Sequence, residues 1–309
     1  MMLSPFQKTI QKEVIFEGVG LHSGLKTNVK VLPASENYGI TFKRTDLDKN
    51  NLIKANFENV SSAQLCTTLQ NKFNVTVSTV EHLLAALYIT GIDNALVEVS
   101  NLEVPIMDGS SKEFVETIFS TGVKNQNAKR KYLKITKKLE LKESEKTISI
   151  EPDVEGLKVD FQLVYSNDVI GTQSNQINFS DADLKNVYTS RTFCLYEDIE
   201  KIKKVGLAKG GSLDNAIVVK NDEILNTEGL RNNKEFVNHK ILDLAGDFLL
   251  SGFRILGSVK CSQGGHSLSN LFLRAIFEKK SNYVVIEQEE SISSKNYFKT
   301  STNKLAVNA

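Results

Sequence analysis

A histidine and two aspartates recur at intervals of four in the segment NHKILDLAGD (238–247): His239, Asp243 and Asp247. Side chains four residues apart lie on one face of an α-helix, so these three would form a polar stripe among apolar neighbours. A buried stripe costs free energy unless its groups find partners. Imidazole nitrogen and carboxylate oxygen both suit zinc, so His239 and Asp243 could bind one cation. The alternative is a surface His–Asp pair that stabilises the helix by about 0.3–0.5 kcal/mol.

A second polar pair, Glu81-His82, precedes an apolar run earlier in the chain. A catalytic zinc has three protein ligands and an open position, and His82 would complete the set begun by His239 and Asp243. A metal held there would lower the pKa of a water from about 15.7 towards about 7, with Glu81 near enough to accept its proton. The same ligands accept Fe²⁺. The alternatives are a helix-capping role for Glu81 and a core position for His82.

A third motif, GGH at 264–266, ends in another histidine. Its two glycines let the backbone approach a ligand closely. His266 could then act as an acid, a base or an electrostatic stabiliser, with Asp247 to orient it. The alternative is a flexible turn with an incidental histidine.

Helical periodicity and terminal signals predict the elements that carry these residues. Helices are expected at 78–91, 108–122, 191–206, 234–252 and 266–280. Ser78 with Glu81, and Ser110 with Glu113, have the spacing of a capping box, and Gly91 suits a helix C-terminus.

Strand-like segments fill most of the remaining sequence, at 13–45, 94–100, 132–142, 147–152, 157–165, 176–180, 213–220 and 253–265. The polar stretch 124–131 predicts a boundary that divides the chain into domains 1–125 and 131–309. DNALV at 93–97 resembles DNAIV at 214–218, which suggests two related halves. This order of elements favours α+β layers with a ligand site between them over a doubly wound parallel sheet.

The overall composition excludes several classes of protein. The 309 residues include 38 Lys and Arg against 37 Asp and Glu, so the basic excess of nucleic-acid-binding proteins is missing. Apolar residues make up 40%, which is too many for a disordered chain. The three cysteines are far apart, which indicates free thiols in a reducing cytoplasm. With no signal-peptide core and no run of roughly 18 apolar residues, we expect no stable membrane insertion.

Seven motifs resemble, in order and spacing, those of the UDP-3-O-acyl-N-acetylglucosamine deacetylases of lipid A biosynthesis in Gram-negative bacteria. They are GVGLHSG (18–24), STVEHLLAAL (78–87), VPIMDGSS (104–111), SRTFCL (190–195), GGSLDNAIVV (210–219), NHKILDLAGD (238–247) and GGHSLSN (264–270). The resemblance covers nearly the whole chain. It implies two similar two-layer α/β sandwich domains with β-α-α-β cores, an α+β fold with zinc bound between the domains.

The resemblance also implies an activity and the residues that perform it. Water would remove the N-acetyl group of UDP-3-O-acyl-N-acetylglucosamine, giving acetate and a free amine. The implied zinc ligands are His82, His239 and Asp243. The implied catalytic residues are Glu81 as general base, His266 as general acid or oxyanion stabiliser, Asp247 as its orienting partner, and Thr192 as a hydroxyl donor to the carbonyl oxygen.

Substrate contacts follow from the same motifs. Lys240 and Phe193 match positions near the glucosamine, and Ile199, Leu213 and Val218 match the lining of an apolar passage for the acyl chain. Relatives often carry Phe where this chain has Leu213, which bears on the width of the passage. We expect a cytoplasmic monomer whose partner is this substrate.

Two other functions remain open from the sequence. One is a zinc amidohydrolase that acts on another N-acyl sugar. The other is a nucleotide-sugar or lipid-binding module with a structural metal, but structural zinc is usually closed by four protein ligands. His22, in the glycine-rich segment 18–24, is a candidate fourth ligand, although a structural or hydrogen-bonding role suits it better.

Overall fold

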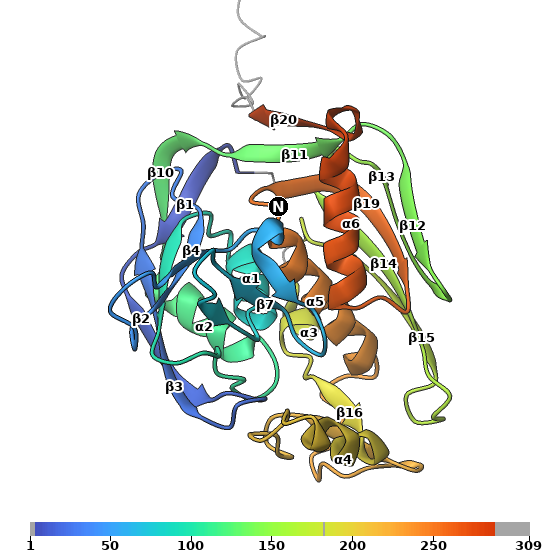
Figure 1. Ribbon diagram of the computed structural model, residues 1–309. Coiled ribbons are helices and arrows are strands. Elements are labelled where there is room, and N and C mark those ends of the chain that lie inside the picture. The colour runs from blue at the N-terminus through green and yellow to red at the C-terminus, as the bar shows by residue number, and fades with distance from the viewer. Residues whose placement is uncertain (1–3, 182, 288–309) are drawn as a thin grey trace, which may run out of the picture.

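A computed structural model describes residues 4–181 and 183–287 and shows two halves (Figure 1). We call residues 4–129 the N-terminal half and residues 131–287 the C-terminal half. Each half contains the same arrangement of five sheet strands, and in the C-terminal half β11 (Lys131–Ile135) and β20 (Tyr283–Glu287) extend the sheet to seven strands. The first sheet has the order β2 (Val14–Val19), β3 (Lys26–Pro33), β9 (Ala95–Val99), β4 (Ile40–Arg44), β5 (Leu52–Lys54). The second has the order β12 (Leu139–Glu143), β13 (Lys146–Pro152), β19 (Arg254–Ser262), β14 (Leu157–Val164), β15 (Thr172–Asn178).

The two sheets have the same topology. In each, the central strand pairs antiparallel with one neighbour and parallel with the other, as β9 does with β3 and β4, and β19 with β13 and β14. The outer pairs are antiparallel in both sheets. The repeat predicted from the sequence is therefore confirmed, although the match that suggested it is misleading. DNALV leads into β9, whereas DNAIV leads into β17 (Ile217–Lys220), and the true counterpart of β9 is β19.

Each half adds two helices to its sheet, which completes the predicted two-layer α+β architecture. They are α1 (Glu81–Thr90) and α2 (Lys112–Thr121) in the N-terminal half, and α5 (Glu235–Leu249) and α6 (His266–Glu278) in the C-terminal half. Figure 1 shows the helices between the two sheets, with α1 beside α5 at the centre.

The contact between α1 and α5 is unusually close. A Cβ on Gly246 would lie 2.1 Å from the carbonyl oxygen of Glu81, so only glycine fits there. Every residue of α1 except Ile89 is buried, as is every residue of α5 except Lys240. Polar residues on these helices must therefore find partners inside the protein.

Each half carries an insertion at the same topological place, directly before its first long helix. In the N-terminal half it comprises η1 (Phe57–Asn59), β6 (Val60–Ser62), β7 (Thr68–Gln70) and β8 (Thr76–Val77). In the C-terminal half it comprises α3 (Lys185–Tyr188), β16 (Phe193–Leu195), α4 (Tyr196–Lys204), β17 and β18 (Glu223–Ile224). The helix predicted over 191–206 is thus partly wrong, because its first residues form β16. Figure 1 shows β16 and α4 set apart from both sheets.

The polar stretch 124–131 contributes to two strands. β10 (Val123–Lys129) pairs antiparallel with β1 (Phe6–Ile10). β11 (Lys131–Ile135) pairs with β19 and with β20 (Tyr283–Glu287). Arg130 lies between them, and its guanidinium binds Asp93 at 2.6 Å. The chain therefore pairs with a strand of the N-terminal half before Arg130 and with strands of the C-terminal half after it.

Of the two signals predicted for the ends of α1, the C-terminal one is confirmed and the N-terminal one is wrong. Gly91 ends the helix in the left-handed conformation with φ of 80°, as predicted. The capping box is wrong, because the Ser78 hydroxyl donates to the carbonyl of Leu102 and the Glu81 carboxylate accepts from the backbone N–H of Thr67. Tertiary partners therefore replace the local cap. Within the described residues, no helix has the length and apolar character needed to cross a membrane.

Candidate active site

The side chains of His82, His239 and Asp243 converge where α1 meets α5. Nε2 of His82 and Nε2 of His239 lie 3.5 Å and 3.4 Å from Oδ1 of Asp243, and one ligand atom from each residue lies within 4.8 Å of the others. Two ligands about 2.0–2.1 Å from zinc at the tetrahedral angle would be about 3.3 Å apart. The separations therefore fit one small cation.

The electrostatics of these residues also fit a metal. Burial lowers the pKa of His239 to about 3, so its imidazole is neutral, and Nδ1 lies 3.1 Å from the carbonyl of Ser190. That contact places the proton on Nδ1 and leaves the Nε2 lone pair free to bind a metal.

The two oxygens of Asp243 have different surroundings. Although burial alone would raise the pKa of Asp243, His239 and Lys240 hold it well below its ordinary value. Oδ2 accepts from Nζ of Lys240 at 2.8 Å, whereas Oδ1 finds no hydrogen-bond partner among the described residues. A buried carboxylate oxygen without a partner is costly, and a cation at this point would satisfy it.

Glu81 lies beside the ligands and has the properties of a general base. Its carboxylate is buried, and this burial raises the pKa of Glu81 above its ordinary value. Oε2 accepts from the backbone N–H of Thr67 at 3.0 Å, and Oε1 lies 3.7 Å from Nε2 of His266. A carboxylate with a raised pKa is a better proton acceptor near neutral pH than an ordinary one.

His266 begins α6 and forms a pair with Asp247. Its Nδ1 lies 2.9 Å from Oδ2 of Asp247. Burial alone would lower the pKa of His266, but the carboxylates of Asp247 and Glu81 raise it to about 10, so the imidazole is a cation at neutral pH. A Cβ on Gly264 would lie 2.3 Å from Sγ of Cys261, so a glycine is required where the chain turns into this helix.

Thr67 contacts two of the predicted catalytic residues, and no sequence pattern predicted this contact. Besides its N–H bond to Glu81, its hydroxyl donates to Oδ1 of Asp247 at 2.7 Å. Thr67 lies in the loop before β7, and no helical spacing relates it to α1 or α5. Its pairing with the site arises only from the tertiary fold.

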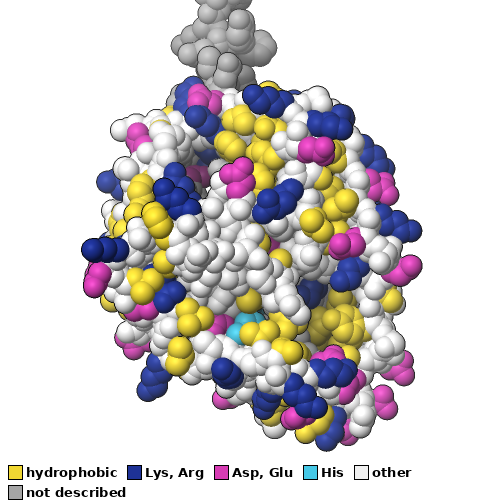
Figure 2. Space-filling model, viewed as in Figure 1, with side chains coloured by type: hydrophobic (Ala, Val, Ile, Leu, Met, Phe, Trp, Pro, Cys, Tyr) yellow, Lys and Arg dark blue, Asp and Glu magenta, His cyan; other side chains and the backbone are white. Residues whose placement is uncertain are grey.

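A polar pocket of about 600 Å³ opens beside the metal ligands. Its lining includes Lys240, His266, Thr192, Phe193 and Tyr165. Lys240 also lies over the ring of Phe193, with Nζ 5.7 Å from the ring centroid. Figure 2 shows one histidine side chain at the surface of the face that it draws, with hydrophobic and acidic side chains beside it.

A second, more apolar cavity of about 360 Å³ lies against β16 and α4. Its lining includes all three predicted passage residues, Ile199, Leu213 and Val218. Thr192 and Phe193 line this cavity as well as the polar pocket, so the two spaces share a wall. Leu213 is 44% exposed and lies at the outer part of the lining.

His22 lines the apolar cavity, and its backbone is bound to residues of both halves. Its N–H donates to Oε1 of Glu103 at 2.9 Å, and its carbonyl accepts from the N–H of Lys209. Burial lowers the pKa of His22. These contacts agree with the structural role preferred for it, and the group of potential metal ligands found among the described residues does not include it.

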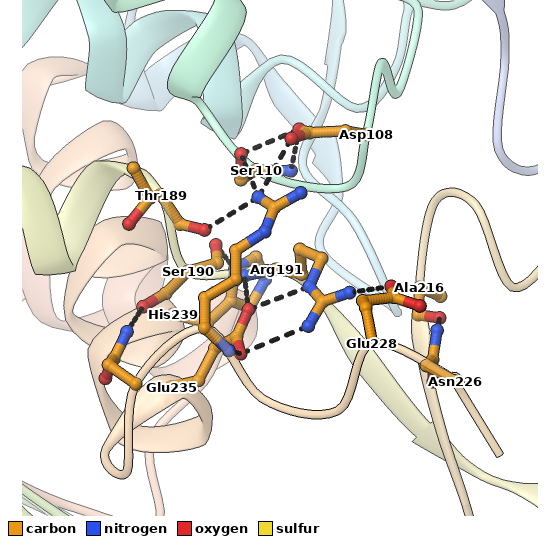
Figure 3. A network of polar contacts seen from close by, with 12 residues as sticks. Asp108, Ser110, Thr189, Ser190, Arg191, Ala216, Asn226, Glu228, Glu235 and His239 are labelled. Atoms are coloured by element: carbon orange, nitrogen blue, oxygen red, sulfur yellow. Dashed lines mark hydrogen bonds and ion pairs between the residues drawn. The ribbon is translucent and has the colours of Figure 1, made fainter. Parts of the chain in front are cut away.

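A buried ion pair holds the segment that leads to Thr192 (Figure 3). Arg191 is 1% exposed, and its Nε donates to Oε1 of Glu235 at 2.8 Å, with a further contact to Glu228. Although burial lowers the pKa of Arg191, Glu235 raises it above the ordinary value. The adjacent Ser190 supplies the carbonyl that His239 contacts, so this network positions a candidate metal ligand.

The same network connects the two halves of the protein. Arg231 Nη1 lies 2.8 Å from Oδ2 of Asp108, which comes from the N-terminal half. The Ser110 hydroxyl donates to Asp108 Oδ1, so the second predicted capping box is also replaced by other contacts. The backbone N–H of Thr192 donates to the carbonyl of Gly109 at 2.8 Å. The predicted hydroxyl donor is thus held by both halves.

Comparison with known proteins agrees with this arrangement. The family model for UDP-3-O-acyl N-acetylglycosamine deacetylase matches residues 7–278. The chain is 41% identical over 290 residues to the UDP-3-O-acyl-N-acetylglucosamine deacetylase of Idiomarina loihiensis, covering 92% of this chain and 94% of that protein. It is 40% identical over 273 residues to the deacetylase of the same name from Glaesserella parasuis (87% and 89% covered), and 40% over 288 residues to that of Shewanella oneidensis (92% and 94%). The chain therefore belongs to the UDP-3-O-acyl N-acetylglycosamine deacetylase family.

Proposed function

We propose that this protein hydrolyses the N-acetyl group of UDP-3-O-acyl-N-acetylglucosamine in lipid A biosynthesis, giving acetate and the free amine. One observation carries the proposal: three metal-ligand side chains converge beside Glu81 and the His266–Asp247 pair, next to a polar pocket and an apolar cavity. Family membership and the names of the relatives support the substrate.

His82, His239 and Asp243 would hold the metal, which we propose to be zinc, with Fe²⁺ as the alternative. A divalent cation at this position supplies Lewis acidity, which polarises a carbonyl and makes water more acidic. The neutral His239 and the free Oδ1 of Asp243 favour its binding.

The chain's own residues perform the proton transfers. Glu81 accepts a proton from the attacking water, because its raised pKa makes it a competent base. The Thr192 hydroxyl donates to the amide carbonyl oxygen, and the cationic His266 stabilises the negative charge that develops there. Asp247 fixes the orientation of His266. The leaving nitrogen takes its proton from His266 or from Glu81.

The two cavities divide the substrate between them. Lys240 and Phe193, in the polar pocket, would contact the glucosamine. Ile199, Leu213 and Val218 would line the passage of the acyl chain. Since Thr192 lies in the shared wall, its hydroxyl would be close to the sugar that joins the two parts.

We further propose that the protein is a cytoplasmic monomer made of domains 1–125 and 131–309. The site draws ligands from both halves of one chain, so a second copy is not needed to complete it. Size-exclusion chromatography with light scattering tests this assembly state.

Acetate release from purified protein tests the proposed function. UDP-3-O-acyl-N-acetylglucosamine should be deacetylated, and the unacylated UDP-N-acetylglucosamine should be a much poorer substrate because it leaves the apolar passage empty. Equal turnover of both compounds would favour an amidohydrolase of another N-acyl sugar. Bound metal without any acetate release would favour a binding module with a structural metal.

A further inference from the structure

Thr67 donates hydrogen bonds to both the proposed base and the carboxylate behind the proposed acid. It is 2% exposed and lies in the loop between β6 and β7 of the N-terminal half. Its backbone N–H donates to Glu81 Oε2 at 3.0 Å, and its hydroxyl donates to Asp247 Oδ1 at 2.7 Å. Glu81 begins α1 and Asp247 lies on α5, so the two bonds span the junction of the halves.

The main chain of Thr67 is fixed relative to α1. Its carbonyl accepts from the N–H of Val80, directly before the helix, while its own N–H binds the Glu81 carboxylate. With both backbone groups bound to the start of α1, the hydroxyl has a defined position from which to reach α5. A displacement of Thr67 would therefore affect Glu81 and Asp247 together.

The hydroxyl also determines how Asp247 uses its two oxygens. Oδ2 faces Nδ1 of His266 at 2.9 Å, and Oδ1 faces Thr67. Asp247 is buried, so an Oδ1 that lost its donor would be left without a hydrogen bond. This loss would favour rotation of the carboxylate. Rotation of Asp247 would turn the His266 ring, whose Nε2 lies 3.7 Å from Glu81 Oε1.

We propose that Thr67 is a positioning residue for the deacetylation, an inference that rests on the proposed function. It is not among the residues that would hold the metal. Through its backbone it orients Glu81, and through its hydroxyl it holds Asp247 so that His266 presents Nε2 to the reacting amide. Residues that orient active-site groups in this way commonly change activity by 10–100-fold when removed.

Three variants separate this role from simple packing. Thr67→Val keeps the shape and removes the hydroxyl, whereas Thr67→Ser keeps the hydroxyl and removes the methyl group. Thr68→Val is the matched control: it makes the same change one residue later, where the hydroxyl lies 3.9 Å from Sγ of Cys66 and contacts neither carboxylate. Each variant is assayed for kcat, KM, metal content and thermal unfolding.

We expect kcat to fall about tenfold or more in Thr67→Val, with KM within about twofold and the metal content unchanged. Thr67→Ser should recover most of the loss, and Thr68→Val should match the wild type. An unchanged kcat in Thr67→Val, or equal losses in Thr67→Val and Thr67→Ser, would overturn the inference. Loss of the metal along with kcat would also overturn it, because Thr67 would then support the ligands.

A double-mutant cycle with Asp247→Asn tests whether Thr67 acts through Asp247. Thr67→Val should cost little further activity in the Asp247→Asn background, whereas full additivity of the two losses would contradict the mechanism. If Thr67→Val does not fold, Thr67→Ala and Thr67→Ser are compared in the same cycle, since the hydroxyl still distinguishes them.

A spectroscopic measurement separates failure of this inference from failure of the proposed function. The low-field NMR signal of the His266 Nδ1–H, identified by its loss in His266→Gln, should move in Thr67→Val and not in Thr68→Val. Wild-type protein that releases no acetate would contradict the proposed function alone. An active wild type whose signal and kcat are both insensitive to Thr67→Val would contradict only the role of Thr67.

Discussion

Nδ1 of His266, the first residue of α6, lies 2.9 Å from Oδ2 of Asp247 on α5. The pair connects two helices of the C-terminal half, and Nε2 of the same ring faces Glu81 from the N-terminal half at 3.7 Å. A single imidazole is thus oriented by one half and directed towards a carboxylate of the other. Its charge state therefore bears directly on the catalysis proposed at the junction.

Replacing His266 by alanine should reduce turnover and spare the metal. The imidazole is proposed to stabilise developing charge, an effect worth about 10²–10³-fold for one lost donor. His266 is not one of the three residues that would hold the metal. Metal content measured by elemental analysis should therefore equal that of the wild type. Loss of the metal in His266→Ala would refute its assignment as a non-ligand.

The Asp247→Asn variant should change the pH dependence of the reaction. Against the effect of burial, the carboxylates of Asp247 and Glu81 raise the pKa of His266 to about 10. A histidine that works as a cation loses activity as pH rises through its pKa. Removing the charge of Asp247 lowers that pKa, so the alkaline limb of the kcat/KM profile should move to lower pH. A limb that stays in place would show that another group controls it.

Metal binding should stabilise the protein, and each ligand should be needed for this effect. At a free concentration of about 100 times its Kd, a ligand that binds only the folded state adds about 2.7 kcal/mol to the free energy of unfolding. Zinc added after chelation should therefore raise the Tm of the wild type. His82→Gln should show little of this increase, and an equal increase in that variant would place the metal elsewhere.

The apolar cavity should determine the preferred acyl length. Leu213→Phe adds bulk to its lining and should shorten the longest chain that is well accepted. Each methylene that no longer fits forfeits about 0.8 kcal/mol, roughly a fourfold change in kcat/KM. Competition assays with substrates of graded chain length measure the shift. Identical chain-length profiles for both proteins would place the acyl group outside this cavity.

The Arg191–Glu235 pair should matter more for stability than surface ion pairs do. Removing one partner of a buried pair typically costs 3–5 kcal/mol, since the other charge is left uncompensated. Arg191→Met should therefore lower the free energy of unfolding by about that amount in urea titrations. Lys201→Met, which removes an exposed pair with Asp198, is the control and should cost about 1 kcal/mol or less.

The sequence predicted the parts of the site that follow local spacing. His239, Asp243 and Asp247 lie on one helix as the four-residue interval indicated, and Glu81 and His82 begin another. The repeat of two α+β halves and the family resemblance are confirmed. These features depend on helical periodicity and on motif order, both of which a linear sequence displays.

Other features depend on contacts between distant segments, which no local pattern displays. Thr67 reaches Asp247 across 180 positions of sequence. The capping box predicted at Ser78 does not form, because the Glu81 carboxylate is buried in the site and accepts from the N–H of Thr67. Likewise, the resemblance between DNALV and DNAIV pointed to β17 as the counterpart of β9. The strand order, which defines the repeat, shows that the counterpart is β19.

We propose above all that Glu81 accepts a proton from water beside a metal held by both halves. Acetate release by Glu81→Gln, measured together with its metal content, tests it most directly. Glutamine keeps the size of the side chain and an oxygen for the Thr67 N–H, but it is not a base. We expect retained metal with turnover reduced by about 10²–10⁴-fold. Wild-type turnover in this variant would contradict it.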